Sequence, residues 1–175
     1  VTNQPTYDNN PFNYNPAILF DNTGDFLASA YIPFSNFTDG TKISMYGVMQ
    51  SLGGRTCFTW DDVGPGGKII LGPATAYDER GANITEARIV NAKNDPFPEQ
   101  HLLSSIVGSN ILNVYAEGHL VDDANVVNLT GTVASPITFG KLFEHGFQGS
   151  VLFGELAVYD ASHSAGDKNR IESYF

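Results

Sequence analysis

Three pairs of acidic residues are adjacent in the sequence, at Asp61/Asp62, Asp78/Glu79 and Asp122/Asp123. Paired carboxyl groups hydrolyse glycosidic bonds, and a retaining enzyme needs them about 5–5.5 Å apart. Neighbouring residues on a strand point to opposite faces, so none of these pairs can form such a dyad locally. The motif Glu-x-Asp-x-x-Glu, which would place carboxylates on one face, is absent. An active site would need carboxylates from distant loops, so we expect no enzyme activity.

Other catalytic patterns are also missing. The histidines are scattered and form neither His-x-His nor His-Glu-x-x-His, so they give no local support for zinc. They are His101, His119, His145 and His163. Residues 64–68 (GPGGK) contain glycines like those of a phosphate loop, but their spacing differs and we interpret them as a turn. Cys57 is the single cysteine, which excludes an internal disulfide and favours a buried thiol.

Oxygen-bearing side chains gather in residues 20–25 (FDNTGD). Carboxylate and amide oxygens are the ligands that Ca²⁺ prefers, although the downstream glutamate of an EF-hand is absent here. We predict a calcium site formed by Asp21, Asp25 and Asp160, near the first and last strands. The alternative is an Asx-type turn with no metal. A second candidate cluster, for which a solvated turn is the competing interpretation, consists of Asp122, Asp123 and Asn125.

Trp60 is the one tryptophan and lies in the run Phe58-Thr59-Trp60-Asp61-Asp62. Alternation places Phe58, Trp60 and Asp62 on one face. Sugars stack on aromatic rings, while carboxylates and amides nearby bind their hydroxyl groups. We predict a ligand-binding site here, supplemented by adjacent loops, because loops carry binding on rigid scaffolds. The alternative for Trp60 is a core position between two sheets. The predicted site residues are Trp60, Asp62, Tyr77, Asp78, Arg80, Asn94 and Asp95.

The chain has 175 residues and a formal net charge of −10 at pH 7. An acidic protein repels phosphate backbones, so we expect no nucleic-acid partner. No run of about 18 apolar residues occurs, and we expect no membrane insertion. The first residues are polar and rich in Asn, without the features of a signal peptide, so we expect a domain or mature fragment of a larger protein.

Composition favours a β-protein. Charged residues make up only 16% of the chain, and the 18 glycines and 9 prolines are typical of many tight turns between short strands. We expect a single domain over residues 1–175, with residues 1–16 as an extended lead-in. Strands are predicted near 17–21, 25–29, 42–50, 55–62, 68–72, 74–80, 82–90, 101–107, 111–121, 126–131, 137–141 and 151–160. This pattern indicates an all-β, two-layer antiparallel sandwich.

Two of these strands alternate with period 2. In residues 42–50 one face carries Ile43, Met45 and Met49, and the other carries Lys42, Ser44, Tyr46 and Gln50. In residues 152–160 the predicted faces are Leu152, Leu156 and Val158 on one side, and Phe153, Glu155 and Tyr159 on the other. Such alternation buries one side and leaves the other for solvent or a second layer.

A short helix is predicted at the C-terminal end. Ser164 can cap it, with Asp167 completing a capping box three residues later. Lys168 and Glu172 are four residues apart and can form an ion pair. Three apolar residues fall on one side and are expected to dock on the sandwich: Ile171, Tyr174 and Phe175.

The order of several segments resembles a known family. Residues 14–21 (YNPAILFD) and 23–27 (TGDFL) are similar to the opening "N-P-x-(apolar)-x-F-D-G-x-x-D-Y-L" of LamG-like jelly-roll domains. Residues 112–121 (LNVYAEGHLV) resemble their hairpin "L-x-x-Y-x-(N/D)-G-x-x-V", with Glu117 at a position where Asn or Asp is common.

Two later segments continue this resemblance. Residues 136–140 (PITFG) look like the family strand "x-(apolar)-x-I-G". Residues 154–175, from GELAVYD to IESYF, resemble the closing pattern of jelly-roll modules in large Bacteroidota surface proteins. Residues 51–100 fit poorly and would form the variable loops.

The resemblance implies a concanavalin A-like sandwich of two stacked antiparallel sheets, whose relatives bind glycans or proteins, sometimes through Ca²⁺. We therefore expect a non-catalytic carbohydrate- or surface-binding adhesion module of a larger secreted bacterial protein, located at the cell surface or outside the cell. Its expected partner is a glycan or cell-surface polymer. One alternative is a structural spacer of an adhesin without its own ligand, and a less favoured one is a glycoside hydrolase of the same fold.

Overall fold

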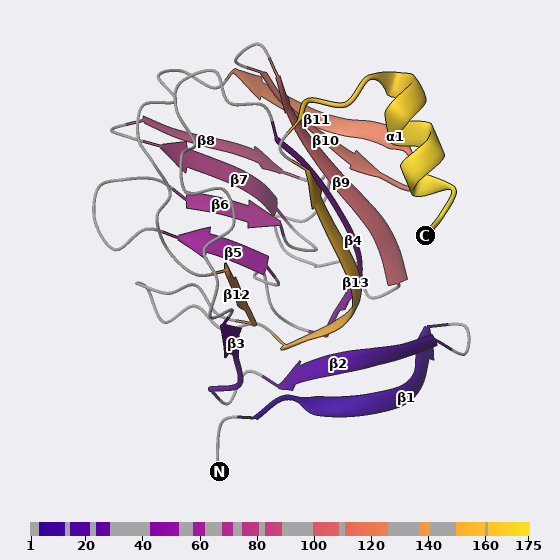
Figure 1. The fold of residues 1–175 in the computed structure, drawn as a ribbon. Helices are drawn as coiled ribbons and strands as arrows, with labels where there is room; N and C mark the ends of the chain where they lie inside the picture. Colours follow the sequence, from indigo (N-terminus) through magenta and orange to yellow (C-terminus); the bar gives the residue numbers. More distant parts are fainter. Residues whose placement is uncertain are drawn as a thin grey trace.

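The computed structural model describes residues 4–12, 15–21, 24–28, 43–52, 58–61, 68–71, 75–80, 83–88, 100–108, 111–125, 137–140, 150–159 and 161–175. These residues form two antiparallel sheets that face each other and one C-terminal helix (Figure 1). The predicted two-layer antiparallel sandwich with a short terminal helix is confirmed. In the described part of the chain, no helix is both long and apolar enough to cross a membrane.

The larger sheet, sheet A, contains seven strands in the order β1-β2-β13-β4-β9-β10-β11. In chain order, its strands are β1 (Thr6–Phe12), β2 (Asn15–Asp21), β4 (Ile43–Ser51), β9 (Gln100–Gly108), β10 (Ile111–Ala116), β11 (His119–Asn125) and β13 (Ser150–Tyr159). The order places the late strand β13 between β2 and β4, so the first and last parts of the chain meet in one sheet.

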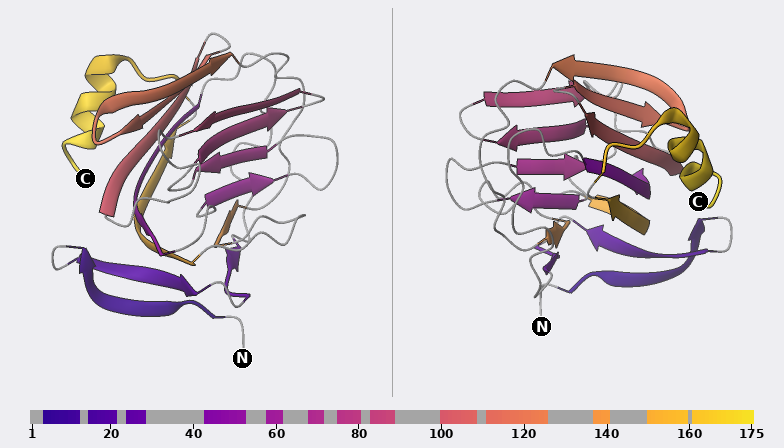
Figure 2. Two further views of the ribbon diagram at one scale, coloured as in Figure 1. Left: turned by 180° about the vertical axis from the view of Figure 1, so that it is seen from behind. Right: turned by 45° about the horizontal axis from the view of Figure 1, so that its top comes forward.

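The smaller sheet, sheet B, has the order β3-β12-β5-β6-β7-β8. In chain order, its strands are β3 (Leu27–Ala28), β5 (Phe58–Asp61), β6 (Lys68–Leu71), β7 (Thr75–Arg80), β8 (Asn83–Arg88) and β12 (Ile137–Phe139). Helix α1 (Ala165–Glu172) lies on the side of sheet A that faces away from sheet B (Figure 2). Sheet A therefore has an inner face toward sheet B and an outer face toward the helix.

The inner face of sheet A carries an apolar core, which includes Met45, Met49, Leu103 and Val114, each at most 1% exposed. The Phe153 ring reaches the Phe139 ring of β12, with centroids 5.2 Å apart, and thereby joins the two sheets. Burial of each large apolar side chain contributes about 1.5–3 kcal/mol. The alternation predicted for residues 42–50 is confirmed over residues 44–49, because Met45 and Met49 lie on the inner face and Ser44 and Tyr46 on the outer one, while Lys42 lies outside the described residues.

The outer face is also apolar near the helix. Val48, Ala17 and Leu152 form a buried cluster against which Phe175 packs from the C-terminal end of the chain. The Phe175 ring stacks on Tyr46 of β4, with centroids 6.5 Å apart. Sheet A thus has apolar side chains on both faces, and the segment that follows α1 covers part of the outer one.

The alternation predicted for residues 152–160 is wrong at Leu152 and Phe153 but is confirmed from Glu155 onward, where Leu156 and Val158 share one face and Glu155 and Tyr159 the other. Phe153 pairs with Met49 and Val158 pairs with Met45, so these four residues share the inner face. Leu152, predicted to lie with Val158, is on the outer face instead. The cause is a register irregularity in the middle of β13, which inserts an extra residue and inverts the alternation after it.

The expected lead-in over residues 1–16 contains strand β1. Tyr7 of β1 pairs with Ile18, and Phe12 pairs with Asn15. The side chains of residues 6–9 are exposed, so the strand carries no alternating apolar signal. Main-chain hydrogen bonds to β2, rather than burial of side chains, define this strand.

The predicted strand over residues 111–121 is a hairpin, β10–β11, as the resemblance implied. Its two-residue turn consists of Glu117 (φ 50°) and Gly118 (φ 79°), both in the left-handed region. A glutamate is unfavourable there, but its backbone N–H donates to the Leu102 carbonyl (2.9 Å) and its carboxylate accepts from the Leu102 N–H (2.7 Å). The predicted strand over 126–131 lies outside the described residues.

The C-terminal helix is confirmed together with its capping box. The Ser164 hydroxyl accepts from the Asp167 N–H (3.2 Å), and the Asp167 carboxylate accepts from the Ser164 N–H (3.3 Å). The predicted ion pair between Lys168 and Glu172 is also present, at 2.7 Å. The expected apolar docking is only partly correct: Phe175 packs on the sheet, whereas the Tyr174 side chain is 77% exposed.

Candidate functional site

A hollow of about 360 Å³ lies between the end of β13 and helix α1. We call it the His163 hollow, and its lining residues are Tyr159, His163, Asp167, Arg170, Ile171 and Tyr174. Two of its aromatic side chains remain accessible, since Tyr159 is 38% and Tyr174 is 77% exposed. Its volume is at the lower end of the range of about 300–1,000 Å³ found for small-molecule sites.

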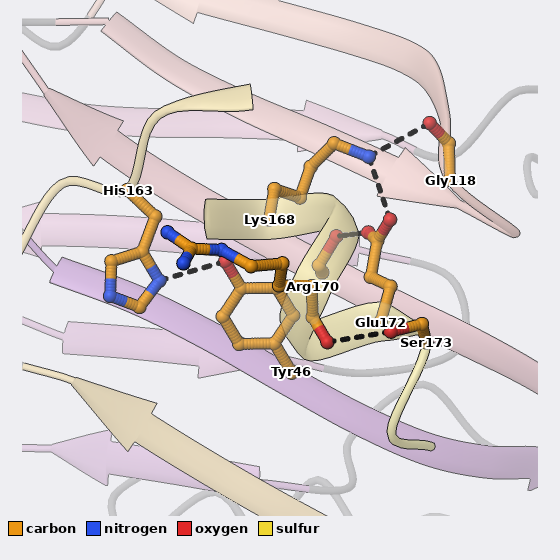
Figure 3. A network of polar contacts seen from close by, with 8 residues as sticks. Tyr46, Gly118, His163, Lys168, Arg170, Glu172 and Ser173 are labelled. Atoms are coloured by element: carbon orange, nitrogen blue, oxygen red, sulfur yellow. Dashed lines mark hydrogen bonds and ion pairs between the residues drawn. The ribbon is translucent and has the colours of Figure 1, made fainter. Parts of the chain in front are cut away.

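His163 is held in place by contacts with strand β4. Its Nδ1 lies 2.9 Å from the Tyr46 hydroxyl, and its backbone N–H donates to the Ser44 hydroxyl at 3.0 Å (Figure 3 shows the first of these). The Ser44 hydroxyl in turn donates to the Ala161 carbonyl at 2.7 Å. The imidazole also stacks on the Tyr46 ring and touches the Tyr159 ring, whose centroid is 4.7 Å away. The ring is therefore positioned before any ligand arrives.

Tyr46 contributes a neutral hydroxyl group. Burial, and then the nearby Glu172 carboxylate, raise the pKa of Tyr46 well above its usual range, because both disfavour a phenolate. The hydroxyl thus stays protonated near neutral pH. It acts as a hydrogen-bonding support for His163 and cannot serve as a base or nucleophile there.

The exposed wall of the His163 hollow is formed by the first turns of α1. The Arg170 guanidinium donates to the Asp167 carboxylate at 2.5 Å. Hydrogen bonds from Ser164, and then the Arg170 contact, hold the pKa of Asp167 below its usual range. The pair offers N–H donors and carboxylate acceptors on a surface whose opposite charges balance.

A buried polar network fixes α1 on the outer face of sheet A. Lys168 donates to the Gly118 carbonyl (3.0 Å) and to Glu172 (2.7 Å), as Figure 3 shows, and its ammonium lies 4.7 Å from the Tyr115 ring centroid. Glu172 also accepts from the Ser104 hydroxyl at 2.7 Å. The two charged side chains are only 6% and 9% exposed. The helix is therefore anchored through charge-assisted hydrogen bonds, which the apolar pattern did not predict.

A second hollow of about 400 Å³ adjoins the first on the outer face of sheet A. We call it the Glu155 hollow, and its lining residues are Asn15, Pro16, Val48, Gly154, Glu155, Tyr174 and Phe175. Residues of β2, β4 and β13 meet here because these strands are neighbours in the sheet. Tyr174 lines both hollows.

Main-chain pairing in sheet B locates the described members of the ligand-binding site predicted around Trp60. Trp60 of β5 pairs with Ile69, and Ile69 pairs with Asp78, so Trp60 and Asp78 occupy one row of sheet B. Tyr77 belongs to the adjacent row, where it pairs with Ile70. Tyr77, Asp78 and Arg80 lie in strand β7 rather than in the loops from which we expected them. Three further predicted site residues lie outside the described part of the chain: Asp62, Asn94 and Asp95.

The structure brings together two of the three residues predicted for calcium. Asp21 ends β2, and the nearby Asp25 is only 5% exposed. Burial, and then the Asp21 carboxyl, raise the pKa of Asp25. Asp160 lies outside the described residues. Within the described residues no three His, Cys, Asp or Glu side chains gather closely enough to hold a metal ion. Because Ca²⁺ takes about 6–8 oxygen ligands, two carboxyls do not complete a site, and calcium stays a prediction.

Sequence reasoning missed the His163 hollow. In the sequence, Tyr159 is a strand residue, His163 is an isolated histidine, and Arg170 is one residue of the segment 154–175 that resembles the family's closing pattern. One signal was present: aromatic and ionisable residues lie immediately before and within the capped helix. The contact partners that orient them, Ser44 and Tyr46, are more than a hundred residues away and could not be identified from spacing.

No protein-family model and no curated protein matches this chain, so the resemblance to LamG-like domains remains a prediction. Solved structures do match. Domain 4 of AbnA, a GH43 extracellular arabinanase from Geobacillus stearothermophilus, in complex with arabinotriose, has a TM-score of 0.69 and 13% identity. The match covers 98% of this chain and 86% of that domain.

Toxin binding domains have the same fold over part of their length. The binding domain of Paraclostridial Mosquitocidal Protein 1 matches with a TM-score of 0.72 and 12% identity, over 99% of this chain and 47% of that one. The botulinum neurotoxin serotype D binding domain in complex with N-acetylneuraminic acid matches with a TM-score of 0.66 and 10% identity, over 97% of this chain and 44% of that one. The chain thus spans less than half of these toxin domains. At such identities the matches show that this chain shares the β-sandwich fold of binding domains.

Proposed function

We propose that this chain is a non-catalytic carbohydrate-binding module of a larger extracellular protein. The observation that carries the proposal is the His163 hollow, where exposed Tyr159 and Tyr174 lie beside the Arg170–Asp167 pair. Aromatic rings bind the apolar faces of sugars, and guanidinium and carboxylate groups bind their hydroxyls. The fold shared with an arabinotriose-bound domain over most of that domain's length supports the same ligand class.

The chemistry of the hollow favours binding over hydrolysis. A glycosidase needs a carboxylic acid whose pKa is raised so that it can donate a proton. The carboxyl group that lines the His163 hollow, Asp167, has a lowered pKa and is engaged by Arg170 and Ser164. Tyr46, beneath it, keeps its proton. Neither group is suited to proton transfer near neutral pH.

The matches to solved structures also bear on the location of the protein and on its neighbouring domains. The similar structures include a domain of an extracellular arabinanase and binding domains of a mosquitocidal protein and of botulinum neurotoxin, which supports an extracellular location and covalently linked neighbouring domains. We retain LamG-like surface adhesion as the finer form of the proposal. The alternative of a structural spacer is disfavoured, because a spacer has no need of exposed tyrosines around a hollow.

A glycan array with the full chain tests this function. We expect signals that weaken about tenfold in Tyr159→Ala and in Tyr174→Ala, since each change removes a stacking surface. Tyr7→Ala is the matched control: this tyrosine is also exposed (62%), and its partner Ile18 lies in the inner-face row of Phe153, away from the helix. No glycan signal, or equal signals from all three variants, would contradict the proposal.

The calcium prediction is tested in the same assay. Glycan signals and unfolding temperatures are compared in calcium chloride and in EDTA. A calcium site near Asp21 and Asp25 would be supported if EDTA lowers the glycan signal or the unfolding temperature of the wild type but has no such effect on Asp25→Asn. Identical results in both buffers would reject it.

A further inference from the structure

The two hollows on the outer face of sheet A meet at one side chain. Tyr174 lines the His163 hollow on one side and the Glu155 hollow on the other. It is the most exposed of the large hydrophobic side chains among the described residues. A ring in this position can contact ligand groups seated in either hollow.

Neighbouring residues also hold Tyr174 in position. Its backbone N–H donates to the Ile171 carbonyl at 3.0 Å, and its ring meets Phe175 edge-on, with centroids 5.6 Å apart. Phe175 is in turn packed against the buried cluster that contains Val48. The ring is therefore presented by a rigid support, so little conformational entropy is lost when a ligand covers it.

The polar groups on either side of Tyr174 suit hydroxyl groups rather than anions. In the His163 hollow the Arg170 guanidinium is neutralised by Asp167. In the Glu155 hollow the side chains of Asn15 and Glu155 are exposed, and Glu155 supplies a carboxylate acceptor. The chain as a whole carries a formal charge of −10. An acidic polysaccharide would be repelled by this surface.

We infer that the two hollows are adjoining subsites of one binding surface, on which an uncharged oligosaccharide lies across the Tyr174 ring. The inference rests on the proposed glycan-binding function and specifies its ligand as a chain of several neutral sugars. A ligand long enough to occupy both hollows gains the second set of contacts intramolecularly, so its affinity exceeds that of a short ligand.

The test measures affinity against ligand length by calorimetry. The probes are neutral arabinan, xylan and glucan oligosaccharides of two to six sugars, with oligogalacturonides as acidic counterparts. We expect at least one neutral series to bind about tenfold more tightly at its longest than at two sugars. Asn15→Ala and Glu155→Gln should abolish this gain, Tyr159→Ala should weaken binding of both lengths, and the control Tyr7→Ala, which lies outside both hollows, should change neither. Both substituted side chains in the Glu155 hollow are exposed, so the fold should persist, which circular dichroism checks.

The outcomes separate the inference from the function on which it rests. Equal affinities for short and long ligands would reject the extended ligand and keep the glycan-binding function. So would binding that Asn15→Ala and Glu155→Gln leave unchanged while Tyr159→Ala weakens it. Tighter binding of the acidic series would reject the uncharged ligand. Failure of every series to bind, or binding indifferent to both Tyr159→Ala and Tyr174→Ala, would reject the function at this surface as well.

Discussion

The Tyr46 hydroxyl lies 2.9 Å from His163 Nδ1 and connects strand β4 with the segment that leads into α1, across 117 residues of sequence. Tyr46 is completely buried, whereas His163 lines an open hollow. A buried side chain thus positions a side chain at the surface. The contact explains how an isolated histidine, which belongs to no recognisable sequence motif, acquires a defined position beside two exposed tyrosines.

This contact predicts how stability depends on alkaline pH. The pKa of Tyr46 is raised in the folded protein, because the folded state favours the protonated hydroxyl. The resulting contribution to the free energy of unfolding is fully present below the pKa of tyrosine in the unfolded chain, about 10, and is lost as pH rises above it. At pH 11 we expect the wild type to have lost about 1 kcal/mol more of its unfolding free energy, relative to pH 8, than Tyr46→Phe. Urea unfolding at both pH values measures this difference. Parallel losses in the two proteins would show that Tyr46 ionises normally.

The buried pair Lys168–Glu172 predicts a large cost for removing one partner. Lys168→Met leaves the Glu172 carboxylate buried without its cation, which costs about 3–5 kcal/mol. The double variant Lys168→Met/Glu172→Leu should cost less than the two single changes together. Arg170→Met is the matched control on the same helix, because its ion pair is exposed and should contribute less than about 1 kcal/mol. Equal losses for Lys168→Met and Arg170→Met in urea unfolding would contradict the anchoring role of Lys168.

The buried carboxyl group of Asp25 predicts how the stability of the folded protein depends on pH in the acidic range. Its raised pKa means that the folded state favours the protonated form, so its stabilising effect is present below about pH 4 and is lost as pH rises through the folded pKa. In calcium-free buffer at pH 7, Asp25→Asn should therefore unfold at a higher temperature than the wild type, and the difference should shrink as the pH is lowered toward 4. A lower unfolding temperature for Asp25→Asn at pH 7 would show that the ionised carboxylate is stabilising.

Trp60 and Tyr174 represent two competing locations for the ligand. Trp60 belongs to sheet B, whereas Tyr174 belongs to the outer surface of sheet A beside the helix. We expect Tyr174→Ala to weaken glycan binding about tenfold and Trp60→Ala to leave it within twofold, provided that the variant remains folded. Glycan-array signals for the two purified variants decide between the locations. The reverse result would place the ligand near Trp60, as the sequence predicted.

Several features of the fold were predictable because they depend on neighbours in sequence. The capping box at Ser164, the Lys168–Glu172 pair and the alternation around Tyr46 each involve residues no more than a few positions apart. Strand β13 shows where such reasoning stops. One inserted residue inverted its alternation, and an insertion of this kind depends on the neighbouring strands rather than on the local pattern.

By itself the sequence determined the layer architecture, since short alternating apolar segments between turns can bury their side chains only in stacked sheets. It also excluded a local carboxylate dyad. The tertiary structure decided where the accessible aromatic surface lies. Strand order brought Asn15, Val48 and Glu155 together, and packing of α1 set Tyr174 between two hollows. These residues are distant in the chain, and only the pairing of whole strands, whose energy is spread over many contacts, makes them neighbours.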